Sequence, residues 1–243
     1  MPAPLVLLPP SEAKRPGGTR RSRRGAFDDD LGATRCQVVE RLGTTLATSS
    51  RLDLEVTLGV RGANYDRARA ALVDLLDGRA ALLPVWQRYS GVVWSHLAPE
   101  TLSTAQRRRL IVPSGLYGLN AGDDLVADYR LKMSARLLGS SVGALWRPVI
   151  ASSLARHARG RVVYDLLPVE HRSAIDVGGL GAARVVTVTF RHGGDGRLAG
   201  HDAKAAKGAF ARHLLEESDV ESFSWHGWRA RVQGTSVDVL YGV

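Results

Sequence analysis

An uninterrupted apolar run near the start of the chain, LVLL at residues 5–8, is followed at once by two prolines. A strand that is apolar at every position has to be covered on both faces, and proline ends it because proline has no N–H for the ladder. The run is far shorter than the roughly 20 apolar residues that cross a bilayer. It also lacks the basic start and the small-residue cleavage site of a signal peptide. We therefore predict an interior strand of a sheet with helices around it.

Helical and strand-like patterns follow one another along the rest of the chain. Apolar residues at helical spacing predict helices over residues 31–48, 63–78, 142–159 and 201–218. Runs rich in β-branched residues predict strands at 110–115, 161–167 and 184–191, and a closing hairpin in which GTS joins WRARVQ to VDVLYGV. With no internal repeat and no linker, residues 1–243 are predicted to form a single compact α/β (mixed α+β) domain with a mixed central sheet.

The charge of the chain predicts an anionic partner. A formal net charge of +9 and a pI near 10.3 favour DNA or a small nucleotide-like anion. KRPGGTRRSRR at 14–24 carries six cations and no acid, which indicates a basic mobile loop at about 14–30 that either contacts phosphate or is simply solvated. Because Cys36 is the only cysteine, no intrachain disulfide is possible and we expect a cytoplasmic location with no membrane association.

PPSEAK at 9–14 is the first of three segments whose side chains suit an anion. It follows the predicted interior strand and so lies at a strand's carboxyl end, where open α/β sheets bind ligands. Ser11, Glu12 and Lys14 can hold an anion and supply an acid or base. The plainer interpretation is a polar exit from the strand.

IVPSGLYG at 111–118 is the second segment. Gly115 and Gly118 permit positive φ and a close approach of the backbone to a partner. The pair is also similar to the hairpin of a helix-hairpin-helix element, in which backbone N–H groups contact phosphate. The alternative is a strand–turn–helix corner with Tyr117 as a packed aromatic residue.

YRLKM at 129–133 extends this second segment. Tyr129, Arg130 and Lys132 provide a hydroxyl and two cations that are suited to phosphate. Together with the glycine turn, they are predicted to form one wall of an anion-receiving site.

The third segment is the predicted helix that begins near residue 201. Lys204 and Lys207 stand in its first turns, where the helix dipole favours anions rather than cations. Their placement is reasonable if an external anion binds at that end of the helix. Otherwise they belong to a solvated helix face.

Other chemistry has little support in the sequence. The seven histidines are scattered, without His-x-x-x-His or Cys-x-x-Cys spacing, so we expect no metal site and no cofactor. GSSVG at 139–143 fits the pattern of a nucleophile elbow around Ser141, but an elbow needs a preceding strand and residues 130–138 have a helical pattern. We interpret GSSVG as a break between helical segments.

These segments, in this order, resemble the YaaA family of peroxide-stress proteins. PPSEAK matches that family's PPSEGK-type motif, and VPSGLYG…L…DYRLKM matches its signature LSGLYG…L…PYRLEM. Three further segments of this chain correspond to family segments. GVRGANYDRA corresponds to an Asn-containing segment, QRYSGVVW to a Tyr-x-Gly segment, and KAAKGAFARHLLE to a C-terminal KKARG…E helix. The similarity spans nearly the whole chain.

The resemblance implies a cytosolic, single-domain protein of the hydrogen peroxide response, with a helix-hairpin-helix-like element. It implies sequence-independent binding of duplex DNA through a positively charged cleft, and a role in limiting damage from intracellular iron. With Lys132 added from its own chemistry, the predicted DNA- or anion-binding residues are Ser11, Lys14, Asn64, Tyr89, Ser114, Gly115, Leu116, Tyr117, Gly118, Tyr129, Arg130, Lys132, Lys204, Lys207 and Gly208; Glu12 is carried over with them.

Two departures from the family pattern point to a divergent member. DLLPVEH at 165–171 stands where the family has NLAS-x-EY, so that His171 replaces an expected tyrosine. NAGDD at 120–124 replaces VLRPLD and loses an arginine.

The sequence leaves a second function open, that of an enzyme acting on a nucleotide, nucleobase or similar small anionic substrate. In that case Glu12 is the acid or base, Tyr117 is a proton relay or an orienting hydrogen-bond donor, and Lys204 joins Arg130 in clamping the anion. The candidate catalytic residues are therefore Glu12, Tyr117 and Lys204. Both functions require Lys14 and these side chains to converge on one cationic recess. The oligomeric state is left open.

Overall fold

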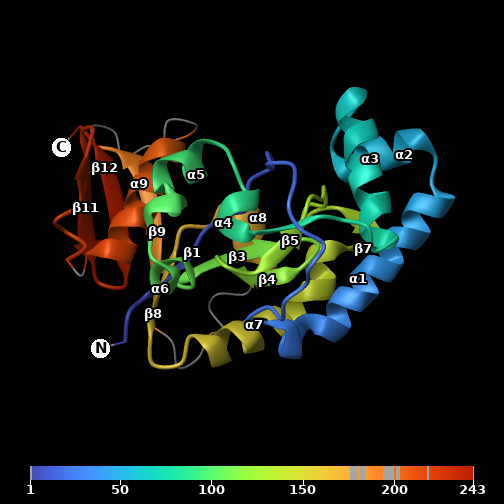
Figure 1. Cartoon of the computed structure of the whole chain (residues 1–243). Coiled ribbons are helices and arrows are strands. Elements are labelled where there is room, and N and C mark those ends of the chain that lie inside the picture. Colours follow the sequence, from blue (N-terminus) through green and yellow to red (C-terminus); the bar gives the residue numbers. More distant parts are fainter. Residues whose placement is uncertain are drawn as a thin grey trace.

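Strand β1 (Leu5–Leu7) lies inside the central sheet, as the apolar run predicts. It runs parallel to both neighbours, β3 (Leu110–Ser114) and β8 (Val162–Asp165). The computed structural model describes residues 2–175, 180, 184–193, 200, 203–217 and 219–242. Within them the sheet has eight strands in the order β10–β11–β12–β9–β8–β1–β3–β4 (Figure 1).

The sheet is mixed because parallel pairing is confined to its middle. Strands β12, β9, β8, β1 and β3 are parallel to their neighbours in that order, and β4, β11 and β10 add antiparallel pairs at the two ends. The other strands of this sheet are β4 (Gly118–Ala121), β9 (Arg184–His192), β10 (Ser224–Trp225), β11 (Trp228–Gln233) and β12 (Ser236–Tyr241). Two small separate pairs are β2 (Leu82–Pro84) with β5 (Leu125–Ala127), and β6 (Arg136–Leu137) with β7 (Ser140–Ser141).

Helices cover both faces of the sheet because β1 is apolar on both sides. Leu5 and Leu7 face the cluster beneath α1 (Asp28–Thr48) and α7 (Val142–His157). Val6 and Leu8 join the opposite cluster, which α5 (Val92–Leu97) and α9 (Ala203–Glu216) cover. The remaining helices are α2 (Arg51–Leu58), α3 (Ala63–Leu76), α4 (Val85–Arg88), α6 (Thr104–Arg107), α8 (Val169–Ile175) and the 3₁₀ helix η1 (Pro99–Thr101).

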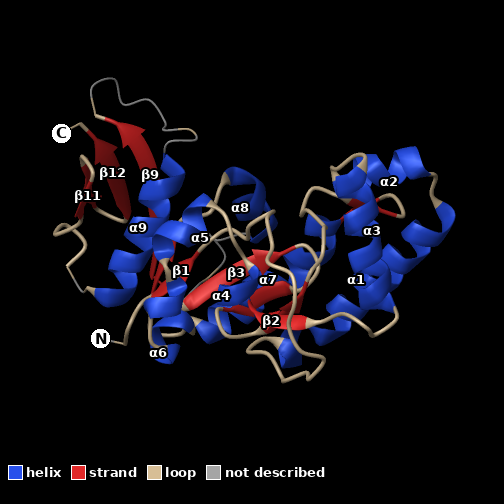
Figure 2. Ribbon diagram, turned by 45° about the horizontal axis from the view of Figure 1, so that its top comes forward, coloured by secondary structure: helices blue, strands red, loops and turns tan. Residues whose placement is uncertain are grey.

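The α2–α3 pair lies at the end of the molecule opposite to β10–β12 (Figures 1 and 2). The predicted helices at 31–48, 63–78 and 142–159 correspond to α1, α3 and α7, and the closing hairpin is β11–β12. The mixed α/β prediction of one compact domain is therefore confirmed. Among the described residues, none of the helices is both long and apolar enough to span a bilayer.

The helical expectation for residues 130–138 is wrong. This stretch is irregular up to the short strand β6, and Ser141 caps the N-terminus of α7 by accepting a hydrogen bond from the Ala144 N–H. Backbone hydrogen bonds from Val142 to Ala135 and from Gly143 to Met133 hold the stretch against α7. Hydrogen bonds to the start of α7 thus take the place of hydrogen bonds within a helix. Ser141 of GSSVG is the N-cap of α7 and not the centre of a nucleophile elbow.

The basic segment at 14–30 is fastened at several points of its backbone. Thr19 pairs with Leu82, and the guanidinium of buried Arg88 donates to the carbonyl oxygens of Arg15 and Gly17. The last part of the predicted loop, residues 28–30, is instead the first turn of α1, because three aspartates there favour the positive end of the helix dipole. Mobility of the remainder stays a prediction.

Candidate anion-binding site

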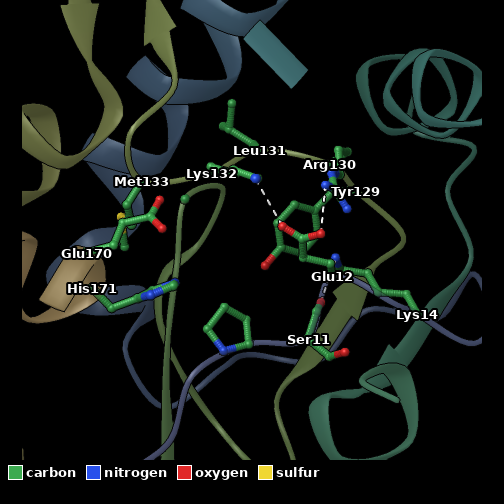
Figure 3. Close-up of a pocket in the computed structure, with 12 residues that line it drawn as sticks. Ser11, Glu12, Lys14, Tyr129, Arg130, Leu131, Lys132, Met133, Glu170 and His171 are labelled. Carbon is green, nitrogen blue, oxygen red and sulfur yellow. Dashed lines mark hydrogen bonds and ion pairs between the residues drawn. The ribbon is translucent and has the colours of Figure 1, made fainter. Parts of the chain in front are cut away.

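A pocket of about 70 Å³ lies at the carboxyl edge of the parallel strands (Figure 3). Three of its walls follow the ends of parallel strands, which lie together at one edge of the sheet, and the fourth, residues 129–133, follows β5 of a separate antiparallel pair. Ser11 comes after β1, Gly115 after β3, and His171 lies on α8 after β8. The polar and charged side chains of this pocket, called the anion pocket below, are those of Ser11, Glu12, Lys14, Tyr129, Arg130, Lys132, Glu170 and His171.

Lys14 is a partly buried cation of the anion pocket. Its ammonium lies 4.4 Å from the centre of the Tyr129 ring and 5.5 Å from that of Tyr89, and it donates to the Ser11 carbonyl oxygen at 3.2 Å. Burial lowers the pKa of Lys14 to about 8, and no carboxylate within the described chain forms an ion pair with it. Its remaining N–H bonds are available to an anion in the pocket.

Glu12 lies between the other two cations of the anion pocket (Figure 3). Its carboxylate oxygens are 2.9 Å from Arg130 Nη2 and 3.0 Å from Lys132 Nζ. Burial alone raises the pKa of Glu12, but hydrogen bonds and ion pairs with Lys132 and Arg130 outweigh it and lower the pKa. Glu12 is therefore an ionised carboxylate at neutral pH and occupies the position that an external anion would take.

A chain of buried hydroxyls supports the floor of the anion pocket. The Tyr129 hydroxyl is 2.7 Å from both the Tyr89 hydroxyl and Ser114 Oγ, and Ser114 Oγ accepts from the Tyr117 N–H at 3.1 Å. Burial raises the pKa of Tyr129 to about 12 and raises that of Tyr89 well above its ordinary value, so both stay protonated at neutral pH. The network fixes the Tyr129 ring beneath the Lys14 ammonium.

Glu170 and His171 lie across the anion pocket from Arg130 and Lys14 (Figure 3). Burial lowers the pKa of His171, which is therefore neutral at pH 7, and its Nδ1 has no hydrogen-bond partner within the described residues. Glu170 accepts a hydrogen bond from the Ser134 hydroxyl at 2.8 Å. The sequence marked His171 only as a departure from a family pattern; its burial in the pocket is visible only in the fold.

Lys207 reaches the same sheet edge from α9. Its ammonium donates to the Leu166 carbonyl oxygen at 2.9 Å, and burial lowers its pKa to about 8. Beside it, buried Asp165 accepts a hydrogen bond from Arg172 at 2.6 Å. Lys207 thus packs against the end of β8 without lining the anion pocket, whereas Lys204 is exposed in the first turn of α9.

The glycine turn is a β-hairpin, so the helix-hairpin-helix expectation does not describe it. Strands β3 and β4 flank the turn, with Ser114 opposite Gly118. Gly118 has φ +77°, and a Cβ there would lie 2.6 Å from the Trp146 ring; a Cβ on Gly115 would lie 2.5 Å from the Leu131 carbonyl oxygen. Both glycines therefore allow close packing of the chain on itself.

Several predicted site residues do not reach the anion pocket. Tyr117 lies behind Tyr129, and its hydroxyl accepts from the Ala127 N–H at 2.9 Å. Leu116 is buried in the core, Asn64 is exposed at the start of α3, and a Cβ on Gly208 would lie 2.2 Å from the Val93 carbonyl oxygen where α9 packs on α5. The candidate catalytic residues Glu12, Tyr117 and Lys204 are thus not brought together.

Arg88 is a structural residue that sequence reasoning missed. It is 1% exposed, and burial lowers its pKa. Its guanidinium donates to the carbonyl oxygens of Arg15, Gly17, Ala81 and Val126. One buried cation thereby holds the segment after Lys14 against β2 and β5, and no local pattern in the sequence distinguishes it from surface arginines.

Comparison with known proteins agrees with this arrangement of segments. Residues 5–232 match the family model described as peroxide stress protein YaaA. A UPF0246 protein of Streptomyces coelicolor is 33% identical over 87% of this chain and 82% of its own, and one of Corynebacterium efficiens is 30% identical over 86% and 84%. A third, from Maricaulis maris, is 28% identical over 98% of this chain and 95% of its own. The chain belongs to the YaaA (UPF0246) family of peroxide-stress proteins.

Proposed function

We propose that this family member binds a small phosphate-bearing ligand in the anion pocket as part of its role in peroxide stress, where it limits oxidative damage. The observation that carries the proposal is the Lys14 ammonium, which is disfavoured by burial and forms no ion pair within the described chain, because the carboxylates of Asp128 and Glu12 act on it only at longer range. A buried charge is costly unless an opposite charge or several hydrogen bonds compensate it. A bound anion supplies that compensation.

Size and charge favour one phosphate group in the pocket, with the rest of a nucleotide-like ligand outside. The volume of about 70 Å³ is well below the roughly 300–1,000 Å³ that accommodates a drug-sized molecule. Arg130 and Lys132 also line the pocket, and their present partner Glu12 has a side chain that is 64% exposed. An incoming phosphate displaces this carboxylate into solvent at small cost.

The binding step is tested by calorimetric titration of the full chain with inorganic phosphate. Loss of a charged hydrogen bond costs about 1.5–3 kcal/mol, so Lys14→Met is expected to weaken binding by roughly 10-fold to 150-fold. Arg229→Met, an exposed change on β11, is the matched control and keeps the wild-type affinity. Equal affinities for wild type and Lys14→Met would remove the basis of the proposal.

The cellular role is tested by peroxide survival. Cells that lack the protein are supplied with the wild type, Lys14→Met or Arg229→Met at matched abundance. We expect the wild type and Arg229→Met to restore survival and Lys14→Met to fail. Full restoration by Lys14→Met would separate the anion pocket from peroxide protection.

An enzymatic use of the same pocket is favoured by His171. A neutral imidazole with an unpartnered ring nitrogen is chemically able to take up a proton from a bound substrate. Turnover of nucleotides and nucleobases is therefore measured for the wild type, His171→Gln and Glu12→Gln. Absence of turnover in the wild type with all substrates would leave binding alone as the function.

Sequence-independent DNA binding is a second candidate, favoured by the basic segment. Arg15, Arg20 and Arg21 are exposed, and their side chains form no ion pair within the described chain. Affinity for duplex DNA is then expected to fall with salt, with a log–log slope of roughly −0.9 for each phosphate neutralised. Replacing the three arginines by glutamine should reduce the magnitude of that slope by about 2–3. Duplex binding that is insensitive to salt would exclude this function.

A further inference from the structure

A second cavity, of about 230 Å³, lies behind the anion pocket. Tyr117 lines this cavity and Tyr129 lines the anion pocket, and their rings meet edge to face with centroids 5.6 Å apart. The pair of rings thus forms a wall between the two spaces. The function proposed above uses neither this cavity nor its lining.

Two nitrogen atoms of the second cavity's lining side chains are buried without a hydrogen-bond partner among the described residues. They are Arg35 Nε and Asn120 Nδ2. The other Arg35 donors are engaged, Nη1 with Asp28 at 2.6 Å and Nη2 with the Tyr117 carbonyl oxygen at 3.1 Å. Since an unsatisfied buried donor costs about 1–3 kcal/mol, a partner with acceptor oxygen or nitrogen atoms is expected at each.

Carboxylate acceptors complete the polar lining. The two oxygens of Asp124 accept from the backbone N–H groups of Ala26 at 3.0 Å and Ala121 at 2.7 Å. Burial raises the pKa of Asp124, which makes it the more easily neutralised of the lining acids. Each carboxylate oxygen of Asp28 and Asp124 has a second lone pair, so both can accept from donors on a ligand.

The charges of the lining balance, which argues against a phosphate in the second cavity. Arg23 and Arg35 contribute two positive charges, and Asp28 and Asp124 contribute two negative charges. Apolar walls come from Leu82, Leu125 and Tyr117. A neutral ligand with polar edges and apolar faces fits this combination better than an anion does.

We propose that the second cavity binds a small uncharged ring compound that carries carbonyl acceptors and N–H donors side by side, the chemical pattern of a free nucleobase. The Asn120 carboxamide matches such an edge, because an amide offers a donor and an acceptor next to each other. Asp124 accepts from a ring N–H, and Arg35 Nε donates to a carbonyl oxygen. The volume lies below the range for drug-sized ligands, so a base fits where a whole nucleotide does not.

The test is saturation-transfer NMR on the full chain with uracil, cytosine, adenine and hypoxanthine as probes. We expect at least one base to receive saturation from the wild type. Asn120→Leu removes the amide at similar volume and is expected to weaken that binding at least tenfold, because the ligand loses its polar partner. Arg229→Met is the control and binds like the wild type.

A second variant keeps the test decisive if Asn120→Leu does not fold, which circular dichroism reveals. Ser22 lines the second cavity from an exposed position, so Ser22→Trp narrows the space without disturbing the core. It is also expected to weaken base binding at least tenfold. The proposal is overturned if none of the four bases binds the wild type, or if the folded variants bind as the wild type does. In either case the cavity is not the base-binding site that is proposed here.

Discussion

Glu12 and Arg130 are 118 positions apart in sequence, yet the Glu12 carboxylate lies 2.9 Å from the Arg130 guanidinium. The contact neutralises part of the anion pocket from within the chain. Since the Glu12 side chain is largely exposed, the ion pair is weak enough for an external anion to replace it. In the proposed function, Glu12 therefore competes with the incoming anion for this cation.

Glu12→Gln is expected to strengthen binding of inorganic phosphate by roughly threefold to tenfold. The substitution removes a competing carboxylate, and exposed ion pairs of this kind contribute about 0–1 kcal/mol each. Titration calorimetry at low salt provides the measurement, with the isosteric Glu221→Gln as control because Glu221 is exposed and distant from the pocket. Weaker binding in Glu12→Gln would show that Glu12 holds the cations in place rather than competing for them.

Anion affinity is expected to decline as pH rises through about 8. Burial lowers the pKa of Lys14 to about 8, so the ammonium is charged below that pH and neutral above it. Sulfate is the suitable probe because it does not titrate in this range. In sulfate titrations from pH 6.5 to 9.5, the affinity should be constant below about pH 8 and should fall above it. The Lys14→Met variant should show weak binding with no such step near pH 8.

The fold is expected to gain stability relative to Lys14→Met as pH rises from about 8 to 10.5. Below pH 8 the Lys14 ammonium is charged in both the folded and the unfolded chain, and the full cost of burying it is present. Between the folded pKa of about 8 and the unfolded value near 10.4, the unfolded chain binds the extra proton, so raising the pH favours the folded state. The difference in free energy of unfolding between wild type and variant should shift by about 2–4 kcal/mol. Urea melts at several pH values measure it, and a flat difference would contradict the burial of this charge.

Tyr129→Phe is expected to destabilise the fold by about 1–2 kcal/mol. The substitution leaves the Tyr89 hydroxyl and Ser114 Oγ without their shared partner in a buried network. Tyr241→Phe, at a half-exposed position on β12, is the control and should change stability by less than about 0.5 kcal/mol. Thermal melts compare the two, and equal stabilities would mean that the hydroxyl chain contributes little.

Gly208→Ala is expected to destabilise the fold by about 2–4 kcal/mol, because its Cβ would lie 2.2 Å from the Val93 carbonyl oxygen. Gly32 in α1 is the matched control. A Cβ there meets nothing within 4 Å, so Gly32→Ala should stabilise the protein by roughly 0.5–1 kcal/mol through helix propensity. Chemical denaturation of both variants gives the comparison. A Gly208→Ala protein as stable as the wild type would show that α5 moves away at little cost.

Local patterns in the sequence are enough to predict most helices and strands and the part of the anion pocket that follows β1. The apolar run before Pro9 determined an interior strand, and the polar residues that follow it had to emerge at a strand's carboxyl end. For that reason Ser11, Glu12 and Lys14 were found from the sequence and do line the anion pocket. Alternation and helical spacing are patterns of residues close together in the sequence, so they can be recognised without knowledge of the tertiary structure.

Tertiary structure alone decided which of two nearby tyrosines meets the pocket and whether residues 130–138 form a helix. Tyr129 is turned toward Lys14 by Tyr89 and Ser114, whereas the Tyr117 hydroxyl is held by the Ala127 N–H. Asn120 and Arg35 carry no motif, and their unpartnered nitrogen atoms exist only because distant segments bury them. Burial and the choice of hydrogen-bond partner depend on contacts between separate segments, such as Tyr89 with Tyr129 at 40 positions and Arg35 with Tyr117 at 82 positions, and local residue preferences do not determine such contacts.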